Sequence, residues 1–85
     1  MPEVEVYTTP VCPYCWSAKE LLRRKGVPFL EINVAGEPQR RAEMVARANG
    51  RTTVPQIFVG DMHLGGCDDL YAIEEAWELD RPLTT

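Results

Sequence analysis

The sequence predicts an α/β fold of the order βαβαββα, in which a strand-helix-strand unit is followed by a helix, a hairpin and a last helix. Two observations lead to this expectation. Alternating apolar residues precede a Cys-x-x-Cys motif at Cys12 and Cys15, and the apolar spacing becomes helical directly after it. Farther along, the pair Gly60-Asp61 separates two short apolar runs, which is typical of a tight antiparallel hairpin.

The first half of the chain has the pattern of a βαβ unit. Val4 and Val6 alternate with acidic residues, which indicates a short strand that ends just before the cysteines. Residues 13–25 have helical spacing with basic residues in the last turn, and the apolar run 29–34 follows. A succession of this length predicts two parallel strands joined by a right-handed crossover.

A second helix is predicted over residues 38–48. Its expected buried stripe contains Met44, Val45 and Ala48, and Asn49-Gly50 is the expected stop. The arginines of this helix are expected on its wetter faces: Arg40, Arg41 and Arg47.

The antiparallel hairpin is predicted over residues 56–59 and 62–64. A last helix is expected to begin near Asp68 or Asp69, either of which can cap it, and to end near residue 78. Its apolar residues recur at helical spacing: Leu70, Ile73, Ala76 and Trp77. Residues 79–85 are expected to be loosely ordered.

Two thiols three positions apart at a predicted helix start form the expected reaction centre. The N-terminus of a helix carries partial positive charge and unpaired N–H groups, which favour a thiolate on the first turn. Cys12 is therefore the candidate nucleophile. Pro13 suits a first helical turn, and Cys15 lies one turn farther, within reach of a disulfide with Cys12. Cys15 is the candidate resolving thiol.

Two other interpretations of the motif are less favoured. A Cys-x-x-Cys pair can form half of a zinc site, but the chain offers only Cys67 and His63 in addition and has no second paired motif. A permanent disulfide between Cys12 and Cys15 would close a very small loop, and the sequence shows no secretory signal. No metal ligand is assigned.

Length and charge narrow the possible functions. The 85 residues are expected to form one domain over residues 1–85. A net charge of -4 argues against a nucleic-acid-binding protein, which needs a basic face. No apolar run approaches the roughly 20 residues that span a bilayer, so no membrane association is expected, and the cytoplasm is the expected location.

Together these features resemble a glutaredoxin of the small bacterial dithiol type. The matching residues run nearly from end to end of the chain, and their combination is more specific than any one motif. They are Cys12-Pro13-Tyr14-Cys15, Ala18-Lys19, Leu21-Leu22, Lys25-Gly26-Val27, Arg41 with Glu43-Met44, Thr53-Val54-Pro55-Gln56-Ile57-Phe58 and Gly65-Gly66-Cys67-Asp68-Asp69-Leu70. The resemblance implies a thioredoxin fold with a four-stranded mixed sheet flanked by helices.

The resemblance also implies a glutathione site beside the dithiol. It places Pro55 in a cis peptide bond and pairs the backbone of Val54 with the extended tripeptide. It places the γ-glutamyl carboxylate at the helix N-terminus near Gly66, with Asp68 receiving the α-ammonium group. The expected glutathione-binding residues are Tyr14, Arg41, Thr53, Val54, Pro55, Gly66, Cys67 and Asp68.

One residue of the family pattern is missing. Many glutaredoxins have a lysine a few residues before the first cysteine, where it supports the thiolate and the glycyl carboxylate of glutathione, but residues 8–11 contain none. The helix terminus and Arg41 are the expected sources of positive charge, because Lys19 lies too far along the helix. Cys67 is expected to be a small, partly buried filler, with regulatory oxidation as the alternative.

The implied activity is glutathione-dependent thiol-disulfide exchange on protein-glutathione mixed disulfides and on protein disulfides. The implied partners are glutathione as co-substrate, glutathionylated proteins and disulfide substrates such as ribonucleotide reductase. A monomer without a permanently bound cofactor is expected. Two alternatives stay open: a redoxin recharged by thioredoxin reductase, and a dimer that carries a glutathione-ligated 2Fe–2S cluster.

Overall fold

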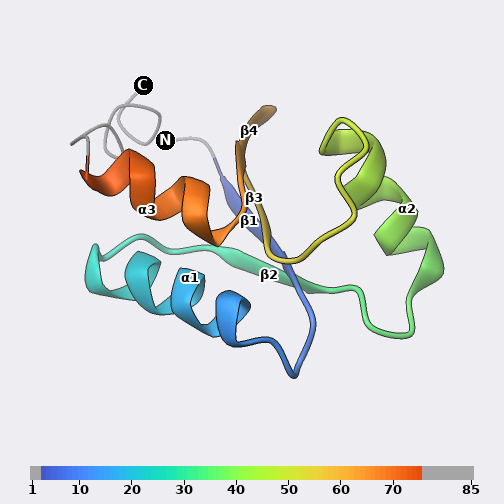
Figure 1. The fold of residues 1–85 in the computed structure, drawn as a ribbon, viewed down its shortest axis with the longest axis horizontal. Helices are drawn as coiled ribbons and strands as arrows, with labels where there is room; N and C mark the ends of the chain where they lie inside the picture. Colours follow the sequence, from blue (N-terminus) through green and yellow to red (C-terminus); the bar gives the residue numbers. More distant parts are fainter. Residues whose placement is uncertain (1–2, 76–85) are drawn as a thin grey trace.

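The computed structural model describes residues 3–75, which form a mixed sheet with helices on both faces (Figure 1). The elements are β1 Val4–Thr8, α1 Pro13–Arg24, β2 Leu30–Asn33, α2 Pro38–Arg47, β3 Gln56–Val59, β4 Met62–Gly65 and α3 Cys67–Glu75. This order confirms the predicted βαβαββα succession, with boundaries within one or two residues of those expected for the strands and the first two helices. For the last helix, Ala76, Trp77 and residues 79–85 lie outside the described residues.

The topology of the sheet brings three distant segments to one end of it. The strand order is β2-β1-β3-β4, with β1 parallel to β2 and both other pairs antiparallel. Because β1 and β3 are antiparallel, Tyr7 near the end of β1 lies opposite Gln56 at the start of β3. Likewise Gly65 at the end of β4 lies opposite Ile57. The loop that carries Cys12, the segment before β3 and the start of α3 therefore meet.

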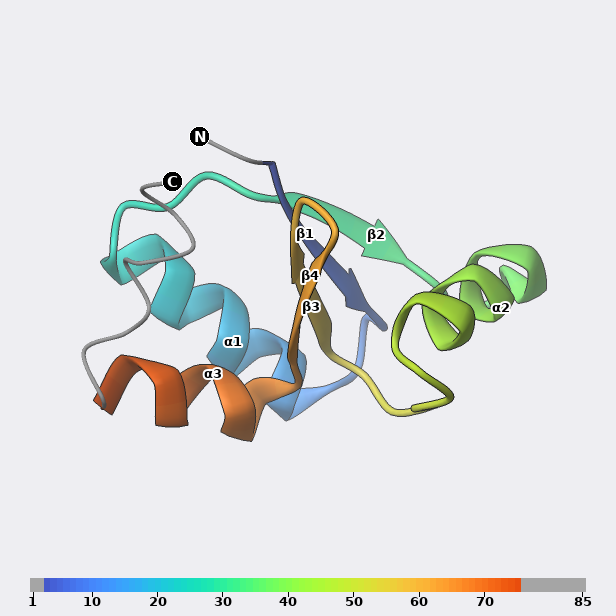
Figure 2. The same ribbon diagram turned by 90° about the horizontal axis from the view of Figure 1, so that it is seen from above.

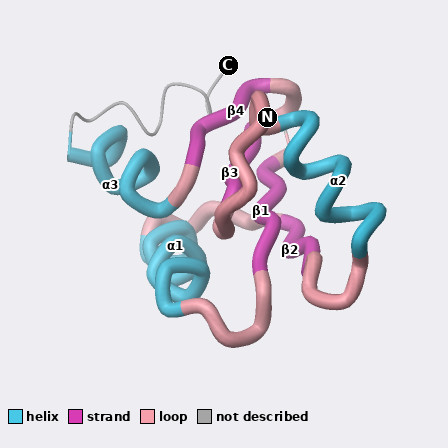
Figure 3. Tube along the Cα trace, turned by 45° about the vertical axis from the view of Figure 1, so that its right-hand side comes forward, coloured by secondary structure: helices cyan, strands magenta, loops and turns pink. Residues whose placement is uncertain are grey.

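The helices cover the two faces of the sheet unequally. Figures 2 and 3 show α1 and α3 side by side on one face and α2 on the other. On the first face, Leu22 of α1 and Leu70 of α3 belong to one buried apolar cluster with the sheet. On the second face, Met44 of α2 packs in a cluster with Phe58 of β3. The predicted stripe of α2 is confirmed, since Met44 and Ala48 are buried and Val45 packs against them.

The prediction that all three arginines of α2 lie on its wetter faces is wrong for Arg47. Arg40 and Arg41 are exposed, but Arg47 is half-buried, with its guanidinium 4.2 Å from the centre of the Phe58 ring. It donates hydrogen bonds to Tyr7 Oη at 2.9 Å and to Glu5 Oε1 at 3.0 Å. A guanidinium stacks on aromatic rings while its edge donates hydrogen bonds, so Arg47 shares the apolar side of α2.

Candidate active site

The two thiols of the motif meet at the start of α1. Cys12 is the N-cap residue, and its Sγ accepts a hydrogen bond from the Cys15 N–H at 3.2 Å. Pro13 occupies the first helical turn, where a backbone N–H would have no intrahelical partner. A backbone donor of the first turn thus contacts the Cys12 sulfur, and this contact stabilises negative charge there.

The environments of the two thiols differ. Both are free, with Cys12 8% exposed and Cys15 fully buried. Burial, followed by the hydrogen bond with Cys12, raises the pKa of Cys15 to about 12. Cys15 therefore stays protonated near neutral pH as long as Cys12 has formed no disulfide. A protonated, buried thiol is a poor nucleophile, and this favours Cys12 as the nucleophile of the pair.

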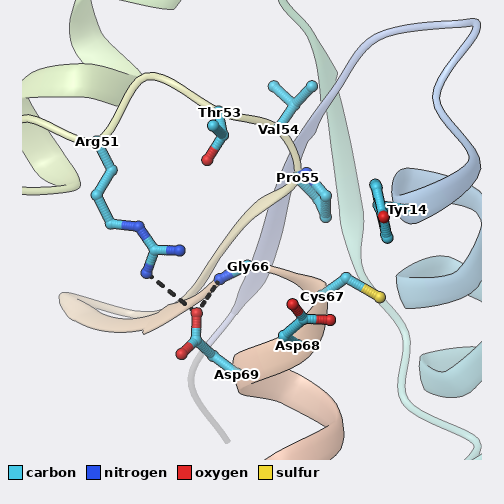
Figure 4. Close-up of a pocket in the computed structure, with 9 residues that line it drawn as sticks. All are labelled: Tyr14, Arg51, Thr53, Val54, Pro55, Gly66, Cys67, Asp68 and Asp69. Carbon is cyan, nitrogen blue, oxygen red and sulfur yellow. Dashed lines mark hydrogen bonds and ion pairs between the residues drawn. The ribbon is translucent and has the colours of Figure 1, made fainter.

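An open pocket of about 330 Å³ lies beside the dithiol (Figure 4). It brings together seven of the eight residues expected for glutathione: Tyr14, Thr53, Val54, Pro55, Gly66, Cys67 and Asp68. The other two lining residues are Arg51 and Asp69. The pocket adjoins Cys12, since Cys12 Sγ lies 3.8 Å from the carbonyl oxygen of Val54.

The cation at this pocket is not the expected one. Arg41 is absent from the pocket lining, and its Nη2 donates to the carbonyl oxygen of Thr52 at 2.9 Å. Arg51 lines the pocket instead, and its Nη1 lies 3.0 Å from Asp69 Oδ2. Arg51 was not among the residues expected from the sequence, although its place just before the Thr53-Val54-Pro55 segment is a signal that could have indicated it.

The segment before β3 has the backbone form that the resemblance implies. The peptide bond between Val54 and Pro55 is cis. Gln56, the first residue of β3, is buried, and its Nε2 donates to the carbonyl oxygen of Thr53 at 2.9 Å. A side chain of the sheet thus anchors the residue that precedes Val54.

At the start of α3 the two aspartates have different positions. The Gly66 N–H donates to Asp69 Oδ2 at 2.8 Å, which is the capping arrangement of a carboxylate three residues into a helix. This hydrogen bond, together with the Arg51 guanidinium, holds the pKa of Asp69 below its usual value. Asp68 is exposed and lines the pocket. The cap therefore belongs to Asp69, and the carboxylate of Asp68 faces the pocket, where it can receive an ammonium group.

Cys67 is buried at the first residue of α3, with 7% of its surface exposed. Burial, and next the charge of Asp68, raise the pKa of its thiol. A thiol held in its protonated form is a poor nucleophile and a slow target for oxidation. These surroundings favour the expectation that Cys67 is a filler.

Comparison with known proteins agrees with this geometry. The family model described as Glutaredoxin matches residues 4–64, which is more than half of the chain. The chain belongs to the glutaredoxin family. A glutaredoxin of Pseudomonas aeruginosa is 58% identical over 84 residues, which cover 99% of each chain.

Solved glutaredoxin structures share the fold. The solution structure of a glutaredoxin from Brucella melitensis has a TM-score of 0.83 and 56% identity, covering 95% of this chain and 87% of that one. A crystal structure of a buckwheat glutaredoxin-glutathione complex has a TM-score of 0.88 and 28% identity, covering 98% of this chain and 77% of that one. The predicted thioredoxin fold is therefore confirmed.

Membership of this family makes the chain a thiol-disulfide oxidoreductase, and the adjacent Cys12 and Cys15 fit its redox-active pair. Glutaredoxins use glutathione as a substrate. Within residues 3–75 no three His, Cys, Asp or Glu side chains gather as a metal site would require. None of the helices in that range is long and apolar enough to cross a membrane.

Proposed function

We propose that this glutaredoxin is a glutathione-dependent disulfide oxidoreductase that reduces protein-glutathione mixed disulfides and protein disulfides. The observation that carries the proposal is the pocket beside Cys12, where the start of α3 and residues 53–55 face a common space. An extended tripeptide with a charged group at each end suits this space. The buckwheat relative was crystallised with glutathione.

Each part of the pocket suits one part of the tripeptide. Gly66 and Cys67 line the pocket at the start of α3. The Gly66 N–H is hydrogen-bonded to Asp69, so the N–H groups that follow it in the first helical turn suit the γ-glutamyl carboxylate, and Asp68 suits its α-ammonium group. The backbone of Val54 suits pairing with the central peptide unit, beside Thr53 and Pro55. Tyr14 is 64% exposed at the edge of the pocket, where its ring suits contact along the ligand.

The glycyl carboxylate of glutathione needs a positively charged partner as well. Arg51 lines the pocket and suits this role by position, whereas Arg41 was the candidate from the sequence. Arg51 lies between α2 and the segment before β3, whereas Arg41 belongs to α2 and reaches this segment through its hydrogen bond to Thr52. Both arginines therefore place positive charge near residues 52–55, but only Arg51 lines the pocket.

The monothiol route needs only Cys12. Its thiolate attacks the glutathione sulfur of a mixed disulfide, so that the protein thiolate leaves and Cys12 becomes glutathionylated. A second glutathione thiolate then attacks the glutathione sulfur on Cys12. Oxidised glutathione is released, and the Cys12 thiolate is restored.

The dithiol route needs Cys15 as well. Cys12 attacks a protein disulfide and forms a mixed disulfide with the substrate, and Cys15 then displaces the substrate thiolate. Two glutathiones reduce the resulting disulfide. A disulfide of ribonucleotide reductase is a substrate of the proposed class, and we place the reaction in the cytoplasm with the chain, one domain, acting as a monomer.

The test is glutathione-dependent release of glutathione from a glutathionylated peptide, compared among wild type, Cys12→Ser and Cys15→Ser. We expect Cys12→Ser to be inactive and Cys15→Ser to keep its activity. Turnover of the wild type by thioredoxin reductase without glutathione would contradict the proposal. So would an inactive wild type that acquires the colour of an iron-sulfur cluster with iron and glutathione.

A further inference from the structure

A lysine next to the resolving thiol is held in a partly buried ion pair. Lys19 follows Cys15 by four residues on α1, so the two side chains lie on the same face of the helix. Its Nζ lies 2.9 Å from Glu31 Oε2 on β2, and the same oxygen accepts a hydrogen bond from Thr8 Oγ1 at 2.8 Å. Only 14% of the Lys19 side chain is exposed. Lysine is rarely buried to this extent unless it is paired.

This ion pair and the Thr8 hydrogen bond join three elements. Thr8 ends β1 and is itself buried, Glu31 belongs to β2 and Lys19 to α1. The Lys19 ammonium, followed by the hydroxyl of Thr8, holds the pKa of Glu31 below its usual range, so Glu31 stays ionised as the partner of Lys19. The position of the ammonium is therefore set by the fold.

Opposing influences act on Cys15. Burial, the hydrogen bond with Cys12 and the negative charge of Cys12 raise the pKa of Cys15. The backbone N–H of Thr9 and the charge of Lys19 lower it. Thr9 follows Thr8 directly, and Lys19 is paired with the Glu31 carboxylate that Thr8 also contacts, so both favourable groups adjoin the same cluster.

The balance changes when Cys12 is covalently occupied. A sulfur in a mixed disulfide carries no charge and is a weak acceptor, so both influences of Cys12 that raise the pKa of Cys15 are removed. Burial remains the opposing influence, and Thr9 and Lys19 remain favourable. The groups near the dithiol from other elements are Cys67 of α3, whose pKa is raised mainly by burial, Asp68, which lines the pocket, and Glu31 of β2, whose carboxylate is paired with Lys19.

We propose that Lys19, held by Glu31 and Thr8, is a positioning residue for the resolving step, in which its ammonium stabilises the Cys15 thiolate. In this step Cys15 loses its proton to solvent and its sulfur bonds to Cys12 Sγ. The bond between Cys12 and the substrate sulfur breaks, and the substrate leaves as a thiolate that takes a proton from solvent. The inference rests on the proposed function, because this step belongs to the dithiol route.

The experiment isolates the resolving step. Reduced protein is glutathionylated on Cys12 with oxidised glutathione at acidic pH, then transferred to neutral pH, and released glutathione is followed by acid quenching and mass spectrometry. The proteins are wild type, Lys19→Met, Lys19→Arg and Arg24→Met. Arg24→Met is the matched control, because Arg24 is an exposed cation on the same helix.

We expect Lys19→Met to release glutathione about threefold more slowly than wild type. Loss of the ammonium raises the pKa of Cys15 and lowers its thiolate fraction, and the greater nucleophilicity of the more basic thiolate returns only part of that loss. Lys19→Arg and Arg24→Met are expected to release glutathione at the wild-type rate.

A second assay separates this inference from the proposed function. In a Cys15→Ser background, where only the monothiol route operates, Lys19→Met is expected to turn over a glutathionylated peptide at the rate of its parent. Equal resolving rates for Lys19→Met and wild type would overturn the role of Lys19. A parallel loss in the monothiol assay would overturn it too, since it would indicate a general defect. Failure of the parent in the monothiol assay would refute the proposed function instead.

Discussion

Arg51 Nη1 lies 3.0 Å from Asp69 Oδ2, the same oxygen that accepts the Gly66 N–H at 2.8 Å. Figure 4 shows this pair at the side of the pocket opposite Tyr14. Both side chains are 46% exposed, so the ion pair itself adds little stability. Its consequence is positional, because it fixes a cation at the pocket of a glutaredoxin that has no lysine in residues 8–11.

The first prediction concerns Arg51. We expect Arg51→Met to raise the KM for glutathione roughly fivefold, equivalent to the loss of about 1 kcal/mol from a charge-assisted hydrogen bond, and to leave kcat nearly unchanged. Steady-state kinetics with varied glutathione measure both constants, and Arg24→Met controls for net charge. A larger KM increase for Arg41→Met than for Arg51→Met would return the role to the residue suggested by the sequence.

The second prediction concerns Asp69 and acid. The Gly66 N–H and Arg51 hold the pKa of Asp69 below its usual 3.8. A depressed carboxyl pKa stabilises the fold above the unfolded value, and this contribution is lost as the pH falls through the folded value. We therefore expect Asp69→Asn to unfold at lower urea than wild type near neutral pH.

The difference between Asp69→Asn and wild type is expected to shrink below pH 3.8, where Asp69 begins to be protonated. Urea unfolding across this range measures it. Asp68→Asn, an exposed aspartate of the same helical turn, is the matched control. A difference that stays constant with pH would contradict the role of the Asp69 charge.

The third prediction uses Trp16 as a reporter. Its Nε1 donates to the carbonyl oxygen of Pro10 at 3.2 Å, and the side chain is 52% exposed directly after Cys15. Because Trp16 directly follows Cys15, a disulfide between Cys12 and Cys15 alters its surroundings, and we expect Trp16 fluorescence to change on reduction. The measurement uses a Trp77→Phe background, and identical spectra in the two redox states would contradict this placement.

The fourth prediction concerns Arg47 on the other face of the sheet. We expect Arg47→Met to lower the free energy of unfolding by about 1–3 kcal/mol, because Tyr7 Oη and Glu5 lose a charged donor. Glutathione kinetics are expected to stay near those of wild type. Urea unfolding measures the loss, with Arg40→Met, an exposed arginine of the same helix, as control. Equal losses in the two variants would exclude a special role for Arg47.

The local sequence pattern was sufficient to predict the helices and strands and the position of the two thiols. Period-two alternation at Val4 and Val6, helical spacing after Pro13 and the Gly60-Asp61 turn each depend on neighbouring residues, so the strands, helices and hairpin could be predicted. The position of Cys12 at a helix N-terminus is local as well, and a hydrogen bond from Cys15 to its sulfur follows from it.

Contacts between distant residues could not be predicted in the same way. Arg47 reaches Glu5 across 42 positions of sequence, and Arg51 reaches Asp69 across 18. Long cationic side chains have many rotamers. A pattern of apolar and polar residues identifies an arginine only as polar and does not indicate its partner. The partners of Arg47 and Arg51 therefore depend on how the helices and strands pack in the folded protein. Arg41 was expected at the pocket and Arg51 lines it, because the direction of each arginine side chain depends on how α2 and the following loop pack.

The sequence by itself determined the order of the elements, the two thiols and the Thr53-Val54-Pro55 segment, since each depends on short-range geometry. Only the tertiary structure decided which cation lines the pocket, which aspartate caps α3 and how deeply Cys15 is buried. The physical reason is that desolvation and charge pairing depend on everything packed around a group. The ion pair of Lys19 with Glu31, which joins α1 to β2 beside Cys15, exists only once the parallel strands are in register.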